Sequence, residues 1–241
     1  MVLWIAVALI GTLLLGCTAP PSSTAMIQAQ SPSERPAESP TSVIVKLPEP
    51  KLEGEISLEE ALYRRRSVRE FSAEGLTLQE VSQLLWAGQG QTADWGGRTA
   101  PSAGATYPLE LYLVAGRVDG IAAGVYRYTS EGHSLTKVAD GDVRQRLGIA
   151  AVDQSWVKDA AASIVVASVY ERTTGRYGDR GVTYVHIEAG HAAQNICLQA
   201  VAMDLGAVTV GAFHDDQVSD ILALSGGEVP LYVIPLGRKG V

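Results

Sequence analysis

A run of basic and hydroxyl-bearing side chains, from Arg64 to Phe71, is the first part of the sequence that could do chemistry. It reads Arg-Arg-Arg-Ser-Val-Arg-Glu-Phe, in a chain with only 19 Lys and Arg residues and a formal net charge of −7. Guanidinium groups hold phosphate oxygens through paired, charge-assisted hydrogen bonds, so the run is a candidate phosphate site. It also fits the basic last turn of a helix, because Ser57-Leu58-Glu59-Glu60 forms a capping box just before it. Taken alone, the run supports both interpretations equally.

Three later segments accompany the basic run, and two of them contain small residues, namely Ser102 to Ala105 and Gly211 with Ala212. They are Pro101 to Pro108 (PSAGATYP), Gly211 to Phe213 (GAF) and Pro235 to Arg238 (PLGR). Residues without bulky side chains allow main-chain groups to lie against an aromatic ring. Residues 101–108 by themselves also fit an ordinary loop before a strand, which is the simpler interpretation.

In chain order, the motifs RRSVREF, PSAGATYPLELY, EAGHAAQNICLQA, GAF and PLYVIPLGR resemble those of the flavin-dependent nitroreductase superfamily. The likeness is closer to its SagB/ThcOx-type branch, which contains the azoline dehydrogenases of peptide natural-product pathways, and it runs from about Ile56 to Arg238. It implies an FMN-dependent oxidoreductase that exchanges hydride between flavin N5 and a small-molecule or peptide-derived substrate. It also implies an α+β (α/β sandwich) fold around a mostly antiparallel sheet, and a homodimer whose sites lie between subunits.

Two other functions stay open beside this one. The first, from another class, is a tethered flavin-binding or flavin-delivery protein without turnover of its own. The second is a quinone or nitroaromatic reductase fed by NAD(P)H. Nucleic-acid binding has no support, because the chain is acidic and such proteins need a basic face.

The resemblance also gives the site residues roles toward FMN. Arg65 and Ser67 hold the phosphate or ribityl chain, and Arg238 completes the phosphate clamp. Arg69 reaches the N1/O2 edge of the ring, where a positive charge stabilises the reduced anion. Gln194 and Asn195 approach the flavin from a helix, with a buried amide pair that hydrogen-bonds the backbone as the alternative role. The predicted cofactor residues are Arg65, Arg66, Ser67, Arg69, Pro101, Ser102, Ala103, Gly104, Gln194, Gly211, Ala212 and Arg238.

The pair Arg176-Tyr177 stands where the azoline dehydrogenases of that branch carry a Lys-Tyr pair implicated in catalysis. Dehydrogenation sends a hydride to the flavin and a proton to a base, and Arg stays protonated, so it cannot be that base. A neighbouring cation favours an ionised phenol, which makes Tyr177, supported by Arg176, the candidate for proton transfer. The alternative is that Tyr177 only packs within a loop from Gly175 to Gly181.

Two further motifs suggest different chemistry. Ser155-Trp156-Val157-Lys158 fits the Ser-x-x-Lys of penicillin-binding proteins and β-lactamases, but no Ser-Asp-Asn or Lys-Thr-Gly follows it. His186 and His191 are five positions apart, which separates two imidazoles by about 140° around a helix, whereas zinc-binding pairs use a spacing of four. No metal site is expected, and two cysteines cannot make a disulfide framework or a cysteine-rich zinc site.

The N-terminal part predicts export and tethering. An apolar stretch from Val2 to Leu15 is shorter than the roughly 20 residues of a membrane span and suits a signal-peptide core. It ends in Leu14-Leu15-Gly16-Cys17, which resembles a bacterial lipobox with a lipidated Cys17, although no Lys or Arg stands near Met1. A cleaved signal or an uncleaved anchor is the alternative. Residues 1–17 are therefore a predicted signal peptide, and residues 18–50, with seven of the chain's 11 prolines, a predicted linker. Together they predict an exported, membrane-tethered lipoprotein of the bacterial envelope.

The elements that must position these residues follow from periodicity within residues 51–241, the predicted FMN-binding domain. Capping boxes at Ser57 and Thr77 open two helices. The run Tyr184 to Asp204 has almost no polar face, which predicts a buried helix. The resemblance implies that this helix forms the dimer core. The other predicted helices cover residues 140–149 and 216–224, and the predicted strands cover residues 109–115, 125–128, 163–170, 207–210 and 231–235. Strands alternating with helices predict an α+β sandwich around one sheet.

Overall fold

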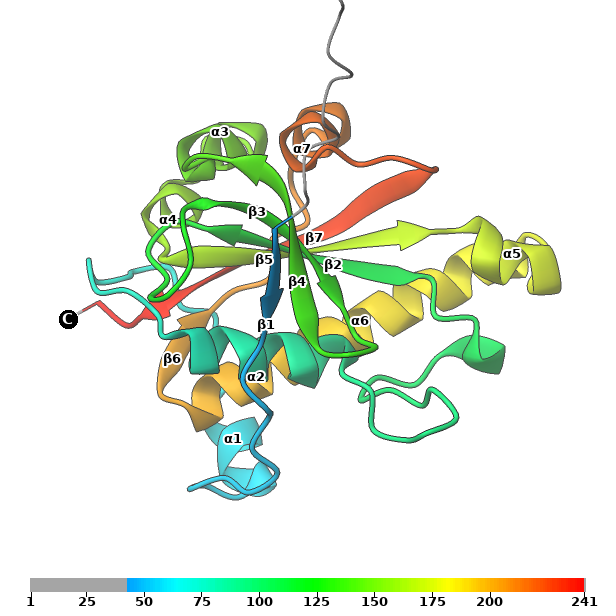
Figure 1. Cartoon of the computed structure of the whole chain (residues 1–241), viewed down its shortest axis with the longest axis horizontal. Coiled ribbons are helices and arrows are strands. Elements are labelled where there is room, and N and C mark those ends of the chain that lie inside the picture. Colours follow the sequence, from blue (N-terminus) through cyan, green and yellow to red (C-terminus); the bar gives the residue numbers. More distant parts are fainter. Residues whose placement is uncertain (1–42, 241) are drawn as a thin grey trace, which may run out of the picture. The chain divides into compact units, whose positions relative to one another are not determined.

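The computed structural model describes residues 43–240 (Figure 1). The predicted signal peptide, Cys17 and the linker as far as residue 42 lie outside the described residues. Within the described residues, no helix is long and apolar enough to cross a membrane.

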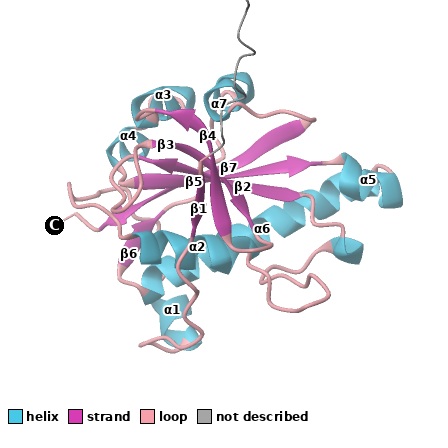
Figure 2. Ribbon diagram, viewed as in Figure 1, coloured by secondary structure: helices cyan, strands magenta, loops and turns pink. Residues whose placement is uncertain are grey.

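One seven-stranded sheet forms the centre of the domain, as Figure 2 shows. Its order is β1-β4-β3-β2-β5-β7-β6, and every pair of neighbouring strands is antiparallel. The predicted α+β fold with a mostly antiparallel sheet is thereby confirmed. The strands are β1 (Ile44–Lys46), β2 (Leu109–Ala115), β3 (Gly124–Thr129), β4 (Ser134–Asp140), β5 (Ala162–Val169), β6 (Leu205–Ala207) and β7 (Glu228–Arg238).

Helices cover both faces of the sheet, because the central strands are apolar on both sides. In β2, Leu111 and Leu113 pack with residues of α2 (Leu78–Gln89) and α6 (Arg180–Ala202). Tyr112 and Val114 point the other way, into a second core with α3 (Arg144–Ala150), the residues around α4 (Ser155–Asp159) and α7 (Asp215–Leu222). The result is a sandwich of three layers.

Three short helices flank the long helix α6. In Figure 1, α1 (Leu58–Arg64) lies near β6 and the C-terminal end of α6, whereas α5 (Glu171–Tyr177) precedes the N-terminal end of α6 on the opposite side. The 3₁₀ turn η1 (Ala103–Ala105) contacts α6 as well. The prediction that α6 is buried was only half right: one face packs on the sheet, but Val182 and Ile187 on the other face are 40% and 48% exposed.

Residues 44–50, which the sequence placed in the linker, pack with the domain. β1 pairs with β4, Leu47 is buried, and the Pro48 carbonyl accepts a 2.6 Å hydrogen bond from the Ser82 hydroxyl. The buried His133 ring joins this contact. Its Nε2 lies 2.6 Å from Ser82 Oγ, and its Nδ1 lies 2.8 Å from the Tyr128 hydroxyl. Proline content suggested a linker, but these polar contacts hold the segment against α2.

Candidate active site

The basic run leaves α1 and lies against the ends of β6 and β7. The Val68 N–H donates to the Ala207 carbonyl at 3.0 Å, and the Ser72 N–H donates to the Arg238 carbonyl at 3.0 Å. Arg65, which the sequence placed in the last turn of the helix, is the C-cap of α1. The structure therefore brings the N-terminal arginines and Arg238 to the same end of the sheet, as the phosphate-clamp hypothesis requires.

Most of the positive charge in this run is free to meet an anion. Within residues 43–240, Arg65, Arg66 and Arg69 form no ion pair with a carboxylate. Arg66 donates from Nη1 to the carbonyls of Tyr63 and Arg65, and Arg69 lies 5.5 Å from the centre of the Trp156 ring. Ser67 is exposed between them. A phosphate suits this set of donors.

Arg238 differs from the other three, because it already has a partner. Its Nη1 and Nη2 lie 2.8 Å and 3.1 Å from the two carboxylate oxygens of Glu80. Glu80 also accepts from the Thr77 N–H in the capping box of α2. A phosphate at Arg238 would compete with this carboxylate, a contact that no sequence pattern pointed to.

The predicted catalytic pair meets the glycine of the predicted ring-facing loop. Gly104 has φ +60°, and a Cβ on it would collide with the Tyr177 hydroxyl and the Arg176 guanidinium. Arg176 Nη1 donates to the Gly104 carbonyl at 3.1 Å. The Tyr177 ring stacks edge-on against Tyr184, with ring centres 5.2 Å apart. Tyr177, predicted to lie in a loop if it only packed, is the last residue of α5.

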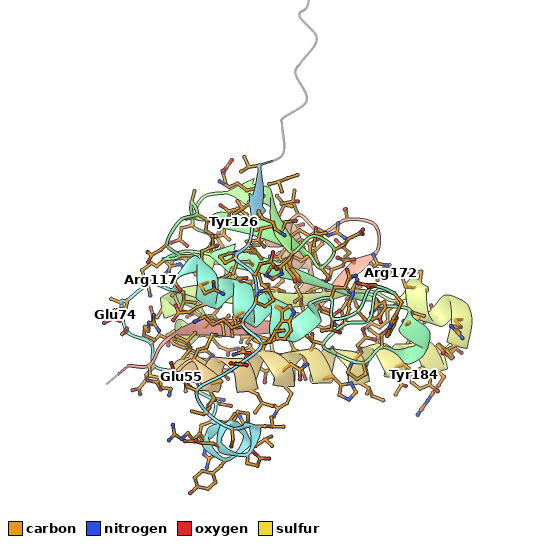
Figure 3. All side chains as sticks on the ribbon, turned by 60° about the horizontal axis from the view of Figure 1, so that its bottom comes forward. Glu55, Glu74, Arg117, Tyr126, Arg172 and Tyr184 are labelled. Atoms are coloured by element: carbon orange, nitrogen blue, oxygen red, sulfur yellow. The ribbon has the colours of Figure 1, made fainter. Side chains whose placement is uncertain are left out.

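Further contacts fix α5 on this loop. Arg172 donates from Nη1 to the Tyr107 carbonyl at 3.0 Å and pairs from Nη2 with Glu110 at 2.6 Å. The hydroxyls of Thr106 and Thr173 are 2.8 Å apart. Figure 3 shows Arg172 and Tyr184 at this end of the domain, far from Glu55 and Arg117 at the other. Three residues of α5 thus hold Tyr177 in position against the loop: Arg172, Thr173 and Arg176.

The predicted cofactor residues fall into separate groups along α6. Arg65 lies near Cys197, toward the C-terminal end of α6, where its positive charge favours the thiolate and so lowers the pKa of this cysteine. Gly104 lies against Tyr177, which comes just before the N-terminal end of α6. A helix of 23 residues spans about 34 Å. Gln194 is exposed along the helix and so is not a buried amide, whereas its neighbour Asn195 donates a 3.3 Å hydrogen bond from its side chain to the Thr99 carbonyl. The segment that leads from Thr99 to Pro101, Ser102, Ala103 and Gly104 therefore lies along the middle of α6, with Ser102 near Glu188.

Gly211 and Ala212 lie in the segment between β6 and α7, beside the strand β7. The preceding Val210 pairs with Val233 of β7, and the Ala212 carbonyl accepts a 3.2 Å hydrogen bond from the Gln154 side chain. Both residues are exposed, so their backbone is accessible to a ligand. A strand was predicted over residues 207–210, but β6 covers Leu205–Ala207. The reason is its pairing with β7, which begins with Leu205 opposite Arg238 and ends with Ala207 opposite Leu236.

One titratable residue was missed as a candidate by sequence reasoning, although it lies inside the motif EAGHAAQNICLQA. Glu188 of α6 is buried, and burial raises its pKa to about 7, an effect partly offset by the Ser102 hydroxyl and the positive charge of Arg98. Its Oε1 has no hydrogen-bond partner among the described residues. Periodicity could have flagged it, since an acidic residue stands on the apolar face of the helix.

A groove of about 800 Å³ lies between residues 51–58, α1, α2 and α6. It is lined by Glu80 and Asn195 but by none of the predicted cofactor residues. This groove therefore does not by itself define the flavin site.

The two competing motifs do not form sites. Ser155 begins α4 and Lys158 pairs with Asp153, so this lysine is already engaged. His186 is 2.6 Å from the Tyr170 hydroxyl, and His191 is exposed. Within the part of the chain that the structure describes, no group of three or more His, Cys, Asp and Glu residues could hold a metal ion.

Comparison with known proteins supports this architecture. Residues 62–238 match the nitroreductase family. The chain is 48% identical over 185 residues to protein MJ1384 of Methanocaldococcus jannaschii, which is named for that family, with 77% of this chain and 92% of that protein aligned. It is 25% identical over 194 residues to the trifolitoxin operon protein TfxC of Rhizobium leguminosarum bv. trifolii, covering 74% of this chain and 54% of TfxC. A crystal structure from Ralstonia eutropha, also named for the nitroreductase family, superposes with a TM-score of 0.73 at 30% identity, covering 86% of this chain and 94% of that one.

The chain belongs to the nitroreductase family. It is an enzyme, an oxidoreductase, and the family to which it belongs binds flavin.

Proposed function

We propose that this protein is an FMN-dependent oxidoreductase whose active site is completed by a second copy of the chain. One observation carries the proposal: one face of α6 is exposed in the single chain although it carries apolar residues, among them Val182 and Ile187. Two copies related by a two-fold axis across the middle of α6 would pack these helices antiparallel. The loop of one copy would then adjoin the arginines of the other.

The outward face of α6 suits such a contact. It is exposed in the single chain, and it carries apolar and small residues near the helix centre, where the axis would pass. Exposed apolar surface of this kind marks protein interfaces. The face includes Val182, His186, Ile187, Gly190, His191 and Gln194.

Each predicted residue has a task in this site. Arg65, Ser67 and Arg238 would bind the phosphate, and Arg69 would place a positive charge near the ring. Bound FMN supplies hydride exchange at N5. Tyr177, with Arg176 5.5 Å from its ring centre, would move the proton that accompanies the hydride.

The substrate class follows the branch of the family. The motifs quoted above and the similarity to a trifolitoxin operon protein favour a SagB/ThcOx-type dehydrogenase acting on a small-molecule or peptide-derived substrate. The replacement of the branch's Lys by Arg176 favours a stand-alone enzyme with a different substrate from the azoline dehydrogenases.

The visible spectrum and the native mass of the purified chain test this proposal together. We expect a yellow dimer with one FMN per chain, reduced rapidly by a substrate under anaerobic conditions. A colourless protein would contradict the cofactor, and a yellow monomer would contradict the shared site. Bound flavin that no organic donor or NAD(P)H reduces would favour the flavin-delivery alternative.

We also propose that the protein is tethered to a bacterial membrane through a lipidated Cys17. The support is the lipobox-like ending of the apolar segment and the proline-rich stretch after it. Stable anchoring needs more than one acyl chain, which lipidation of Cys17 would supply. Mass spectrometry of the membrane fraction should find an acylated Cys17 in the native chain and an unmodified precursor in Cys17→Ser. An unmodified native chain would rule the anchor out.

A further inference from the structure

Glu188 is a buried acid for which the proposed function has no use. Its residue exposure is 2%, and its Oε1 meets no hydrogen-bond donor among the described residues. A buried carboxylate without donors is costly, so the protonated form is favoured. Such a group, placed beside an active site, can hold a proton until the chemistry needs it.

The polar groups that act on Glu188 come from the segment between α2 and β2. They are the Arg98 guanidinium and the Ser102 hydroxyl. Arg98 is held in place, because its Nη1 donates to Gln89 Oε1 at 2.8 Å and its guanidinium lies 4.5 Å from the centre of the Tyr107 ring. A fixed cation nearby stabilises the carboxylate after its proton has left.

On α6 itself, Tyr184 lies one turn before Glu188 and His191 lies about one turn after it. Tyr184 contacts Tyr177 edge-on, and His191 is exposed. Among the elements packed against Glu188, Arg98 supplies the charge that lowers the pKa of this carboxyl.

Ser102 connects the buried acid with the outside of the loop. Its Oγ accepts a 2.9 Å hydrogen bond from the Tyr107 N–H, and the same hydroxyl is one of the groups that lower the pKa of Glu188. Ser102 is partly exposed, and its neighbours Pro101 and Gly104 are exposed. The hydroxyl thus lies between the buried carboxyl and the surface that is predicted to face the ring.

We propose that Glu188 is a proton store for the active site and exchanges its proton with the substrate through the Ser102 hydroxyl; this role rests on the proposed function. When the enzyme reduces an acceptor, a hydride comes from the cofactor and a proton must come from the protein. The Glu188 O–H bond breaks, Ser102 takes that proton on oxygen, and its own hydrogen passes to the acceptor heteroatom. Glu188 remains as a carboxylate beside Arg98 and regains a proton from solvent. Substrate oxidation runs the same transfers in reverse.

The acidity of Glu188 suits this task. Burial raises its pKa to about 7, so the group can give and accept a proton near neutral pH. An ordinary exposed glutamate would be ionised there and could not donate. Because Glu188 acts through Ser102, it is a positioning residue in this scheme.

Three variants of the full chain test the proposal: Glu188→Gln, Ser102→Ala and the conservative Ser102→Thr. Infrared titration of the carboxyl measures the protonation of Glu188 without any turnover. We expect a carboxyl signal that titrates near pH 7 in the native chain, disappears in Glu188→Gln and shifts upward in Ser102→Ala, because the hydroxyl no longer stabilises the anion. A native signal that titrates in the ordinary range of glutamate would overturn the proposal.

The pH profile of flavin reduction tests the relay. We expect an inflection near pH 7 in the native enzyme and in Ser102→Thr, and a flat profile with rates lower by about 10-fold or more in the other two variants. Identical profiles in a flavin-loaded Glu188→Gln would overturn the role of Glu188 alone. The spectrum of the native chain separates this outcome from a failure of the proposed function, since a chain without flavin would overturn both.

Discussion

The Arg176 guanidinium donates a 3.1 Å hydrogen bond to the carbonyl of Gly104, a residue 72 positions earlier in the chain. This bond places the end of α5 on the one residue of the loop whose positive φ and lack of a side chain leave room for Tyr177. Any side chain at position 104 would push the tyrosine away. The two motifs that the sequence offered as ring-facing loop and catalytic pair therefore form one unit.

Tyr177→Phe tests the catalytic part of that unit. The ring and its contact with Tyr184 stay, so FMN content should be normal, while substrate-driven flavin reduction should slow by about 100-fold or more. Stopped-flow absorbance measures the rate. Tyr184→Phe is the matched control, because it makes the same change in the neighbouring ring. An unchanged rate in Tyr177→Phe would remove this residue from the mechanism.

Arg65→Ala tests the phosphate site. Within residues 43–240 Arg65 forms no ion pair, so its loss should leave the fold intact. Losing a buried charge-assisted contact costs about 2 to 5 kcal/mol, or roughly 30-fold to several thousandfold in affinity. The variant should purify folded and colourless, as circular dichroism and absorbance would show. Arg146→Ala, on α3, should stay yellow, and full FMN binding by Arg65→Ala would place the phosphate elsewhere.

Ile187→Asp tests the shared site. Ile187 is 48% exposed in the single chain, so a charge there should not unfold the domain. Two such charges facing each other across an antiparallel pair of α6 helices should separate the subunits and release the flavin. Light scattering and absorbance measure both effects. Ile149→Asp makes the same change on α3, across the sheet, and should remain a yellow dimer; a dimeric Ile187→Asp with flavin would refute this arrangement.

His133 predicts a loss of stability in acid. Burial lowers its pKa below the ordinary 6.5, and both ring nitrogens already have partners in the neutral form. The unfolded chain therefore binds more protons than the folded one below that pH. The stabilising contribution is complete above 6.5 and decreases as the pH falls, by at most about 1.4 kcal/mol per pH unit.

His133→Asn removes this titration and still suits the positive φ of 45° at that position. Urea unfolding between pH 5 and about 7 should show a shallower pH dependence than in the native chain. His191→Asn, on the exposed face of α6, should keep the native slope. An unchanged slope in His133→Asn would mean that the acid sensitivity comes from another group.

Local pattern was enough for the centre of the fold. Residues 109–115 were predicted as a strand and form β2, because every residue of the run except Glu110 is apolar and the run is β-rich. The predicted helix over residues 140–149 was partly wrong. Its start belongs to β4, whose sequence Ser-Leu-Thr-Lys-Val-Ala-Asp is too polar to stand out as a strand, and the helix α3 begins at Arg144.

The parts that were missed depend on contacts between distant residues. α5 contains glycine and was not predicted as a helix, yet Arg172, Thr173 and Arg176 fix it to the segment from Gly104 to Glu110. The pairing of Arg238 with Glu80 joins residues 158 positions apart. No local pattern can reveal such partners, because they depend on how the fold brings the end of β7 to the start of α2.

The three residues of β1 have a consequence for the solubility of the domain. β1 covers the outer edge of the sheet by pairing with Ser134, Leu135 and Thr136 of β4. A protein begun at Lys51 would leave β4, seven residues long, as an open edge strand. Unpaired N–H and C=O groups on such an edge recruit strands from other molecules and lead to aggregation. The segment between the predicted tether and the catalytic domain therefore works as a cap that keeps neighbouring molecules from joining sheet to sheet.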